Sequence, residues 1–193
     1  MIQGILLAAG RSTRFGDDKL RQLLADGRPM ILSAVDALKN QTDEFLIVTN
    51  PENTALHKIL DEQALPYEIC YEARLGMGHS LATGVQATAE ADGWVVGLAD
   101  MPFIPPHIIL TVVHSLREGS SLVAPFYQGK RGHPVGFGSK FKQALIQLTG
   151  DQGARDILKS QNSHLHRIEC DESGILQDID TPTALKAALG TSS

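Results

Sequence analysis

Residues 1–20 constrain the fold more than any other part of the chain. Residues 2–8 form a mostly apolar run without regular polar alternation. Such a run is typical of a strand that is covered on both faces, as in a parallel sheet. Gly10 and Gly16 follow this strand, and glycine lets the backbone turn sharply and approach a ligand closely. The segment therefore predicts a buried strand that ends in a binding loop.

The loop after this strand carries three cationic side chains, Arg11, Arg14 and Lys19, with the hydroxyls of Ser12 and Thr13 among them. Backbone N–H groups together with arginine and lysine are what a polyphosphate requires. The spacing is neither that of a Walker A loop nor that of the dinucleotide-binding fingerprint. A charged surface loop after an edge strand is the alternative. The combination of strand, glycines and cations favours a phosphate-binding loop.

Strand-like and helix-like segments alternate along most of the chain, which predicts an α/β fold with a doubly wound, three-layer α/β/α, mostly parallel sheet. Further strands are expected at residues 45–49, 67–71, 94–99, 122–125, 135–137 and 165–170. Helices are expected near residues 31–38, 51–60, 81–85, 105–116, 141–148, 154–159 and 182–190, the second of them capped by Asn50. Residues 120–138 break the alternation, which predicts a small β insertion that covers the site.

The length and charge of the chain limit its organisation and its partners. A chain of 193 residues can bury a substantial core, and we expect a single domain over residues 1–193. The formal net charge of −5 argues against a nucleic-acid binder. Cys70 and Cys170 lie far apart, with no metal-ligand spacing. No segment has the length of a transmembrane helix, and the first apolar run is too short for a signal peptide, so we expect a cytoplasmic protein without membrane contact.

Three aspartates are candidates for holding a metal or shaping its site. Asp100 directly follows the apolar strand at residues 94–99, and ligands bind at the carboxyl ends of parallel strands. A carboxylate there suits Mg²⁺, which takes one or two carboxylates plus substrate phosphates. A helix cap or an Asx turn is the alternative for Asp100. Asp178 and Asp180 are expected on one side of a strand-like step. Asp180 would contact metal or substrate, or cap the last helix, and Asp178 would be a supporting group.

Residues 76–80 join a strand to a helix N-terminus, where Gly76 and Gly78 would let the backbone approach a base or ribose. Ser80 is a candidate contact too, although capping of the helix is a sufficient explanation for a serine at this point. Asp151 and Arg155 are four residues apart, and we expect them to form a structural ion pair across one helical turn.

His133 lies between Gly132 and Pro134, inside the predicted β insertion. It is either a polar residue of a hairpin or a contact to a ligand. Two cations, Lys130 and Arg131, precede it.

Several of these segments, taken in order, resemble the molybdenum cofactor cytidylyltransferase family, a branch of the MobA-like NTP transferase superfamily. The opening signature Leu-Ala-Ala-Gly-x-Ser-x-Arg-Phe-Gly-x-x-Lys-Leu is the most specific. The resembling segments, which together span nearly the whole chain, are residues 7–20, 76–81, 98–102, 132–135 and 178–182, with a weaker match at 150–155. The residues after Leu20 depart from the family, because Arg21 and Gln22 stand where the pattern usually continues apolar.

The resemblance implies a Rossmann-like nucleotidyltransferase that uses Mg²⁺ to transfer CMP from CTP to molybdopterin or its molybdenum-loaded form, with release of pyrophosphate. It implies catalytic roles for Arg14, Lys19 and Asp100. The implied nucleotide contacts are Leu7, Ala8, Ala9, Gly10, Arg11, Ser12, Arg14, Lys19, Gly78, Ser80 and Asp100. The implied metal ligand is Asp100, which Asp180 would join, and the implied contacts to the second substrate are His133 and Pro134. A general base is not required, because a phosphate nucleophile is already ionised near neutral pH.

Two alternatives stay open beside this hypothesis. One is a cytidylyl- or other nucleotidyltransferase that acts on a sugar phosphate, a polyol phosphate or a different cofactor. The other is a non-catalytic nucleotide-binding module that delivers a cofactor to a molybdoenzyme, which the set of Arg14, Lys19 and Asp100 disfavours. Ala9 favours cytidylyl over guanylyl transfer, since the guanylyl branch usually has glycine there. A molybdoenzyme or a cofactor-delivery protein is the expected protein partner.

Overall fold

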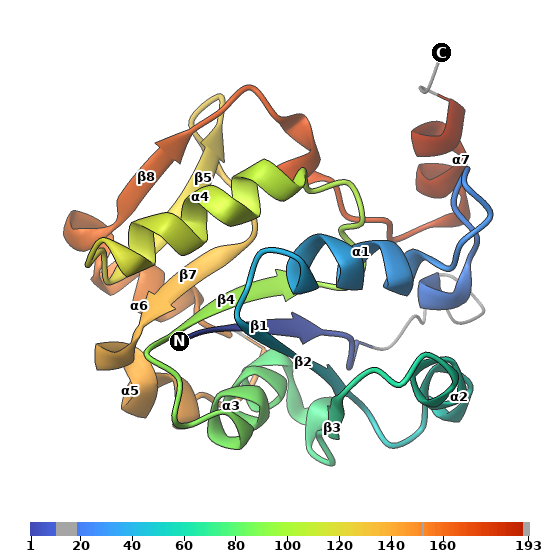
Figure 1. Ribbon diagram of the computed structural model, residues 1–193, viewed down its shortest axis with the longest axis horizontal. Coiled ribbons are helices and arrows are strands. Elements are labelled where there is room, and N and C mark those ends of the chain that lie inside the picture. The colour runs from blue at the N-terminus through green and yellow to red at the C-terminus, as the bar shows by residue number, and fades with distance from the viewer. Residues whose placement is uncertain (11–18, 152, 191–193) are drawn as a thin grey trace.

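The computed structural model describes residues 1–10, 19–151 and 153–190, which form one eight-stranded sheet with helices on both faces (Figure 1). The strands are β1 (Ile2–Leu7), β2 (Glu44–Thr49), β3 (Tyr67–Ile69), β4 (Gly93–Leu98), β5 (Leu122–Tyr127), β6 (Lys130–Arg131), β7 (Val135–Gly138) and β8 (His166–Glu169). The helices are α1 (Met30–Lys39), α2 (Thr54–Glu62), α3 (Met77–Ala87), α4 (Pro106–Arg117), α5 (Lys142–Ile146), α6 (Arg155–Ser160) and α7 (Pro182–Gly190). Within these ranges no helix combines the length and the apolar character that crossing a membrane requires.

The sheet has the order β3-β2-β1-β4-β7-β5-β6, and β8 pairs with β5. β1 lies parallel to β2 and β4, and β2 lies parallel to β3. β7 runs antiparallel to β4 and to β5, so β5 points in the same direction as β1. β8 is parallel to β5. This arrangement confirms the predicted doubly wound, mostly parallel sheet, in which the carboxyl ends of β1, β2 and β4 lie at one edge.

The expected β insertion at residues 120–138 is wrong in its placement. β5 and β7 are integral strands of the sheet, where Val135 pairs with Val96 of β4 and Phe137 pairs with Leu122 of β5. All four of these side chains are buried. Apolar side chains on both faces suit a strand inside a covered sheet rather than a flap over a site. The break in the strand–helix alternation reflects two reversed strands, β6 and β7.

β1 lies inside the sheet, with all six of its residues buried and a paired strand on each side. The alternative of an edge strand is therefore wrong. Its side chains alternate between two apolar layers. Leu6 packs in the layer that includes buried residues of α1 and α4, whereas Ile5 and Leu7 pack in the layer that includes residues of α3, α5 and α6. Figure 1 shows α1 and α4 on one side of the sheet and α3 on the other.

The residue that caps α2, after the turn that follows β2, lies three residues later in the chain than predicted. Asn53, and not Asn50, caps α2, because its Oδ1 accepts a hydrogen bond from the Leu56 N–H at 3.1 Å. Asn50 is buried and holds the turn itself, since its Oδ1 accepts from the backbone N–H groups of Glu52 and Asn53. Its Nδ2 donates to the carbonyl of Ala9 at 3.1 Å. The asparagine thereby fixes the backbone that leads into the first loop.

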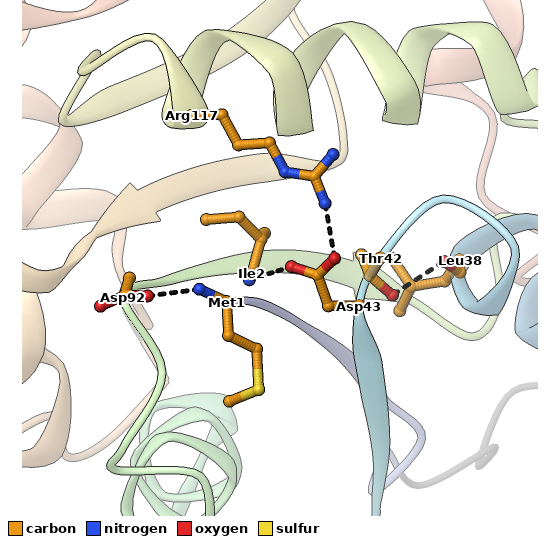
Figure 2. A network of polar contacts seen from close by, with 7 residues as sticks. All are labelled: Met1, Ile2, Leu38, Thr42, Asp43, Asp92 and Arg117. Atoms are coloured by element: carbon orange, nitrogen blue, oxygen red, sulfur yellow. Dashed lines mark hydrogen bonds and ion pairs between the residues drawn. The ribbon is translucent and has the colours of Figure 1, made fainter.

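The opposite, amino-terminal edge of the sheet is held by polar contacts around Asp43 (Figure 2). Its carboxylate accepts a hydrogen bond from the Ile2 N–H at 2.6 Å and one from Arg117 of α4 at 2.6 Å. The hydrogen bond from the Ile2 backbone is the main reason why the pKa of Asp43 lies below its usual value. The backbone nitrogen of Met1 contacts Asp92, just before β4. These contacts tie β1, β2, β4 and α4 together at the edge that lies away from the predicted site.

Candidate active site

The carboxyl ends of β1 and β4 lie side by side. Leu7 is the register partner of Leu98, and the Ala99 N–H donates to the Leu7 carbonyl at 3.0 Å. The Ala8 N–H donates to the Val48 carbonyl of β2 at 2.8 Å. The segment after β1 and the segment that carries Asp100 therefore leave the sheet at the same edge, as the sequence predicted. Arg11, Ser12 and Arg14 lie outside the described residues, so their phosphate contacts stay a prediction.

Lys19 joins two of the three predicted aspartates. Its Nζ donates to Asp100 Oδ2 at 2.8 Å and to Asp180 Oδ1 at 2.6 Å, although these carboxylates are 80 residues apart in the chain. The Lys19 side chain is 13% exposed. Burial by itself lowers the pKa of Lys19, but the hydrogen bonds and charges of Asp100 and Asp180 outweigh it and raise the pKa. Lys19 therefore carries its positive charge between two carboxylates.

The loop of Asp180 is attached to the loop of Asp100 through the backbone. Ile179 is buried, and its N–H donates to the Asp100 carbonyl at 2.9 Å. Residues 177–180 do not form a strand, contrary to the expected strand-like step. Thr181 Oγ1 accepts from the Ala184 N–H at 3.1 Å and so caps α7. The buried isoleucine and the helix cap together hold Asp180 beside Asp100.

The carboxylates of Asp100 and Asp180 fit a shared cation. Each places an oxygen within hydrogen-bonding distance of one ammonium nitrogen, so the two oxygens lie close enough to reach one ion. Partial loss of hydration and the negative charge of Asp180 raise the pKa of nearby Asp178. The described part of the chain has no group of three His, Cys, Asp or Glu side chains arranged for a metal. Two carboxylates plus substrate phosphates and water are the usual ligands of Mg²⁺.

A cleft of about 350 Å³ lies beside these carboxylates. Its lining includes five of the predicted nucleotide contacts: Leu7, Ala9, Gly10, Ser80 and Asp100. The remaining lining residues are Ala73, Arg74, Gly76, Met77, Leu98 and Asp151. Arg74, which pairs with Glu52 at 2.9 Å, is a lining residue that was not among the predicted contacts. The signal was a cation two residues before Gly76, the kind of residue that a cleft for an anionic ligand uses.

Gly76 and Gly78 allow another segment of the chain to pack closely against them. Gly76 has φ +127°, and a Cβ there would lie 2.2 Å from the backbone carbon of Gly150. A Cβ on Gly78 would lie 2.7 Å from the Thr149 carbonyl oxygen, and the Gly78 N–H donates to the Gly150 carbonyl at 2.8 Å. The two glycines therefore let residues 149–151 pack against the start of α3. Contact of Gly78 with a nucleotide stays a prediction.

Ser80 does not cap α3, because Gly76 occupies the cap position and no side chain caps the helix. Ser80 lies one turn inside the helix, is 3% exposed and lines the cleft. The capping explanation for this serine is therefore wrong, and a nucleotide contact stays its predicted role.

A second cavity, of about 520 Å³, adjoins the cleft and shares Leu7, Met77, Leu98 and Asp151 with it. Its other lining residues are Leu81, Val96, Arg131, His133, Val135, Phe137, Gly153, Ala154, Arg155, Leu158 and Lys159. The antiparallel direction of β7 explains the position of His133, because the beginning of β7 lies beside the carboxyl end of β4. Pro134 is buried and lies outside the linings of both cavities.

His133 is an uncharged group near neutral pH. Burial and the charge of Arg131 lower its pKa to about 4, although a hydrogen bond with the Val96 backbone acts in the opposite direction. Its Nδ1 is inaccessible to water and has no hydrogen-bond partner among the described residues. Its backbone N–H donates to the Ile175 carbonyl at 3.0 Å. The imidazole can therefore form a neutral polar contact in the cavity, but it cannot supply a positive charge there.

Curated relatives of this chain carry names from cofactor and purine metabolism. The chain is 35% identical to the purine catabolism protein PucB of Bacillus subtilis, over 93% of this chain and 91% of that protein. It is 30% identical to a probable molybdenum cofactor guanylyltransferase of Thermococcus sibiricus, over 75% of this chain and 71% of that protein.

Solved structures share the fold at lower identity. Rv0371c of Mycobacterium tuberculosis H37Rv has a TM-score of 0.87 and 22% identity, over 98% of this chain and 97% of that chain. The structure of Rv0371c in complex with manganese has a TM-score of 0.82 and 21% identity, with 98% of both chains covered. The MobA-like NTP transferase domain matches residues 4–167. The chain therefore belongs to the family of MobA-like NTP transferase domains and is a nucleotidyltransferase.

Proposed function

We propose that this nucleotidyltransferase transfers CMP from CTP to molybdopterin or its molybdenum-loaded form and releases pyrophosphate. One observation carries the proposal: Lys19, Asp100 and Asp180 meet at the edge of the sheet, beside a cleft that five of the predicted nucleotide contacts line. Nucleotidyl transfer needs cationic groups and a metal at a triphosphate, together with a second site for the acceptor. The cleft and the adjoining cavity offer these two sites.

The reaction is an in-line displacement at the α-phosphorus of CTP. A phosphate oxygen of the acceptor forms the new bond to that phosphorus. The bond to the bridging oxygen of the β-phosphate breaks, and pyrophosphate leaves with the electron pair. Lys19 would stabilise the charge that develops on the phosphates, because its ammonium group is already fixed and partly shielded from water. Asp100 and Asp180 hold that ammonium group in place.

Asp100 and Asp180 would also hold Mg²⁺ when the nucleotide is bound. The metal would supply positive charge that neutralises the phosphate oxygens. The paired carboxylates support this proposal, since both already share a cation. A structural neighbour was solved in complex with manganese, another divalent ion that prefers oxygen ligands.

Two residues, Ala9 and Ser80, support a preference for CTP. A methyl group at Ala9, which lines the cleft, narrows the space beside Gly10 and would disfavour a larger purine. Ser80 offers a buried hydroxyl to the base edge, and a site built on such hydrogen bonds rejects bases that leave them unpaired. GTP is the competing nucleotide, because several relatives are named molybdenum cofactor guanylyltransferases.

A pyrophosphate-release assay tests the proposal, with CTP, GTP, UTP and ATP offered separately together with molybdopterin. CTP is expected to give the highest kcat/KM. A clear preference for GTP would reject the cytidylyl assignment and keep nucleotidyl transfer. Release of pyrophosphate only with a sugar or polyol phosphate would reject molybdopterin as the acceptor. Absence of release with any pair would favour the non-catalytic delivery module.

The variant Asp100→Asn tests the metal assignment within the same assay. It is expected to lower kcat by about a hundredfold or more, since charge stabilisation at the phosphates is lost. Asp92→Asn is the matched control, because Asp92 precedes β4 at the opposite edge of the sheet, whereas Asp100 follows it. Near-normal turnover of Asp100→Asn at ordinary magnesium concentrations would contradict the assignment.

A further inference from the structure

We propose that Arg74 recognises the base of the nucleotide, and that its guanidinium group donates hydrogen bonds to O2 and N3 of cytosine. This inference rests on the proposed transfer of CMP and adds a specificity-determining residue to its nucleotide site. Ala9 narrows the cleft and Ser80 offers one hydroxyl, whereas Arg74 would supply paired donors that only some bases can accept.

Arg74 lies in a short segment whose backbone is held at the nucleotide cleft. It is the middle residue of a 3-10 helix, Ala73–Leu75, between β3 and α3. The Gly76 N–H donates to the Ala73 carbonyl at 3.2 Å, and Gly76 packs closely against the backbone of Gly150. The side chain of Arg74 therefore lines the cleft from a fixed position.

An ion pair orients the guanidinium group of Arg74. Its Nη2 lies 2.9 Å from Oε1 of Glu52, in the turn after β2. The backbone of Glu52 is fixed in turn, because its N–H donates to Asn50 Oδ1 at 3.1 Å and Asn50 Nδ2 donates to the Ala9 carbonyl at 3.1 Å. Both side chains of the ion pair are about half exposed, and such a pair contributes little to stability, which favours an orienting role for Glu52.

The order of the strands separates this ion pair from the phosphate end of the cleft. The proposed metal ligand Asp100 follows β4, whereas Glu52 follows β2, and β1 lies between these two strands (Figure 1). Neighbouring strands are about 4.8 Å apart, so the ends of β2 and β4 are roughly 10 Å apart. A nucleotide whose phosphates lie at Asp100 would extend its base along the same cleft toward Ser80 and Arg74.

The charges around the cleft favour a base over a phosphate as the ligand of Arg74. Among the described residues that line the cleft, Arg74 is the one cation, and the carboxylates are Asp100 and Asp151. The expected ion pair between Asp151 and Arg155 is wrong, because these two described residues form none. Glu52 already neutralises Arg74, so the guanidinium group presents N–H donors rather than a net charge. Such a group suits the neutral acceptor atoms of a base better than a triphosphate.

The pairing edge of cytosine offers the two adjacent acceptors that a guanidinium group requires. An arginine carries five N–H donors in a planar fork and no acceptor. Nη2 of Arg74 faces Glu52, which leaves the donors on Nε and Nη1 for a ligand. O2 and N3 of cytosine lie side by side and both accept. Uracil carries an N–H at position 3 and guanine carries N–H groups at positions 1 and 2, so either base would set donors against donors.

Isothermal titration calorimetry with CTP, UTP and ribose 5-triphosphate, in the presence of Mg²⁺ and without an acceptor, tests the assignment. Ribose 5-triphosphate keeps the sugar and the phosphates and lacks the base. Arg74→Met should weaken the binding of CTP by about tenfold or more, the scale of a lost hydrogen-bonded charge contact, and leave ribose 5-triphosphate unaffected. It should also reduce the preference for CTP over UTP. Arg74→Lys should not restore CTP binding, because an ammonium group cannot donate two parallel hydrogen bonds.

Two further variants examine the surroundings of Arg74. Glu52→Gln removes the charge that orients the guanidinium group, so it should weaken CTP binding by a smaller factor than Arg74→Met and leave ribose 5-triphosphate unaffected. An unchanged affinity for CTP in Glu52→Gln would reject the orienting role. Arg117→Met is the matched control, because Arg117 is half exposed and pairs with Asp43 at 2.6 Å at the opposite edge of the sheet (Figure 2). It should leave the binding of all three ligands unchanged.

The outcomes separate this inference from the proposed function. Unchanged CTP binding in Arg74→Met, an equal loss for CTP and ribose 5-triphosphate, an unchanged preference over UTP, or full recovery in Arg74→Lys would each overturn the base contact. If pyrophosphate is nevertheless released from CTP with molybdopterin, CMP transfer stands without this contact. Base-dependent binding of CTP that requires Arg74, in a protein that releases no pyrophosphate, would keep the contact and reject the transfer.

Discussion

His133 should make the folded protein lose stability as the pH falls from neutral toward 4. In the folded chain its pKa is about 4, because burial and the charge of Arg131 disfavour the protonated ring, whereas an unperturbed histidine has a pKa of 6.5. Above pH 6.5 both folded and unfolded chains carry a neutral ring, so this histidine adds no pH dependence. Between pH 6.5 and 4 the unfolded chain binds a proton that the folded chain rejects, and stability decreases as the pH falls. The free energy of unfolding should fall by about 3 kcal/mol over this window.

Urea unfolding at several values between pH 7 and pH 4.5 measures this loss in wild type and in His133→Gln. Other groups also titrate in this range, so the informative quantity is the difference between the two proteins at each pH. Wild type should lose more stability than His133→Gln as the pH falls, and most of the difference should be present by pH 4.5. His164→Gln, which removes an exposed histidine, is the control and should keep the wild-type loss. Parallel pH profiles for wild type and His133→Gln would refute the buried, uncharged imidazole.

Three further predictions concern other parts of the molecule. Lys19→Ala should lower kcat/KM for the nucleotide by about a hundredfold, because a fixed charge at the phosphates is lost; wild-type rates in a pyrophosphate-release assay would refute its role. Gly76→Ala should destabilise the fold by about 3 kcal/mol in urea unfolding, since its Cβ would clash with backbone at a positive φ. Gly119→Ala, at φ +98° in open space, should cost less, and equal costs would exclude the clash. Asp43→Ala should lower stability by about 1 kcal/mol in thermal unfolding and leave activity unchanged; a matching loss of activity would contradict a purely structural role.

The edge of the sheet at which the first loop and Asp100 lie could be predicted from the sequence, because it follows from simple rules. A run of apolar residues at 2–8 indicated a buried strand, and Asp100 followed another such strand. The carboxyl ends of parallel strands meet at one edge, so the sequence implies that the first loop and the Asp100 loop lie at the same edge, although it does not predict the contact of Lys19 with Asp100. The contact of Lys19 with Asp180 brings the second aspartate to the same edge, and its role toward a metal or substrate stays a prediction.

The errors occur where local sequence patterns do not carry the needed information. A short apolar run such as residues 135–137 does not indicate which way its strand runs relative to its neighbours. The reversal of β7 and its place inside the sheet could therefore not be inferred. Asn50 and Asn53 are both good caps, and only the tertiary contact of Asn50 with Ala9 decides between them. The tight glycines at 76 and 78 correctly indicated a close approach, but the approaching group is backbone from residues 149–151, more than 70 residues later.

The reversal of β7 has a consequence for how substrate choice can change in proteins of this architecture. β7 begins beside the carboxyl end of β4, so the short connection between β6 and β7 lies at the same edge of the sheet as Asp100. In an all-parallel sheet only the segments that follow the strands would lie at this edge. His133 thus lies on a connection separate from the β1 loop and from α3, directly after Arg131 at the end of β6. Substitutions or small insertions there could exchange one acceptor for another while the triphosphate apparatus stays intact. With the proposed function, grafting residues 130–134 between homologues is expected to change the acceptor and to leave the nucleotide half of the reaction unaltered.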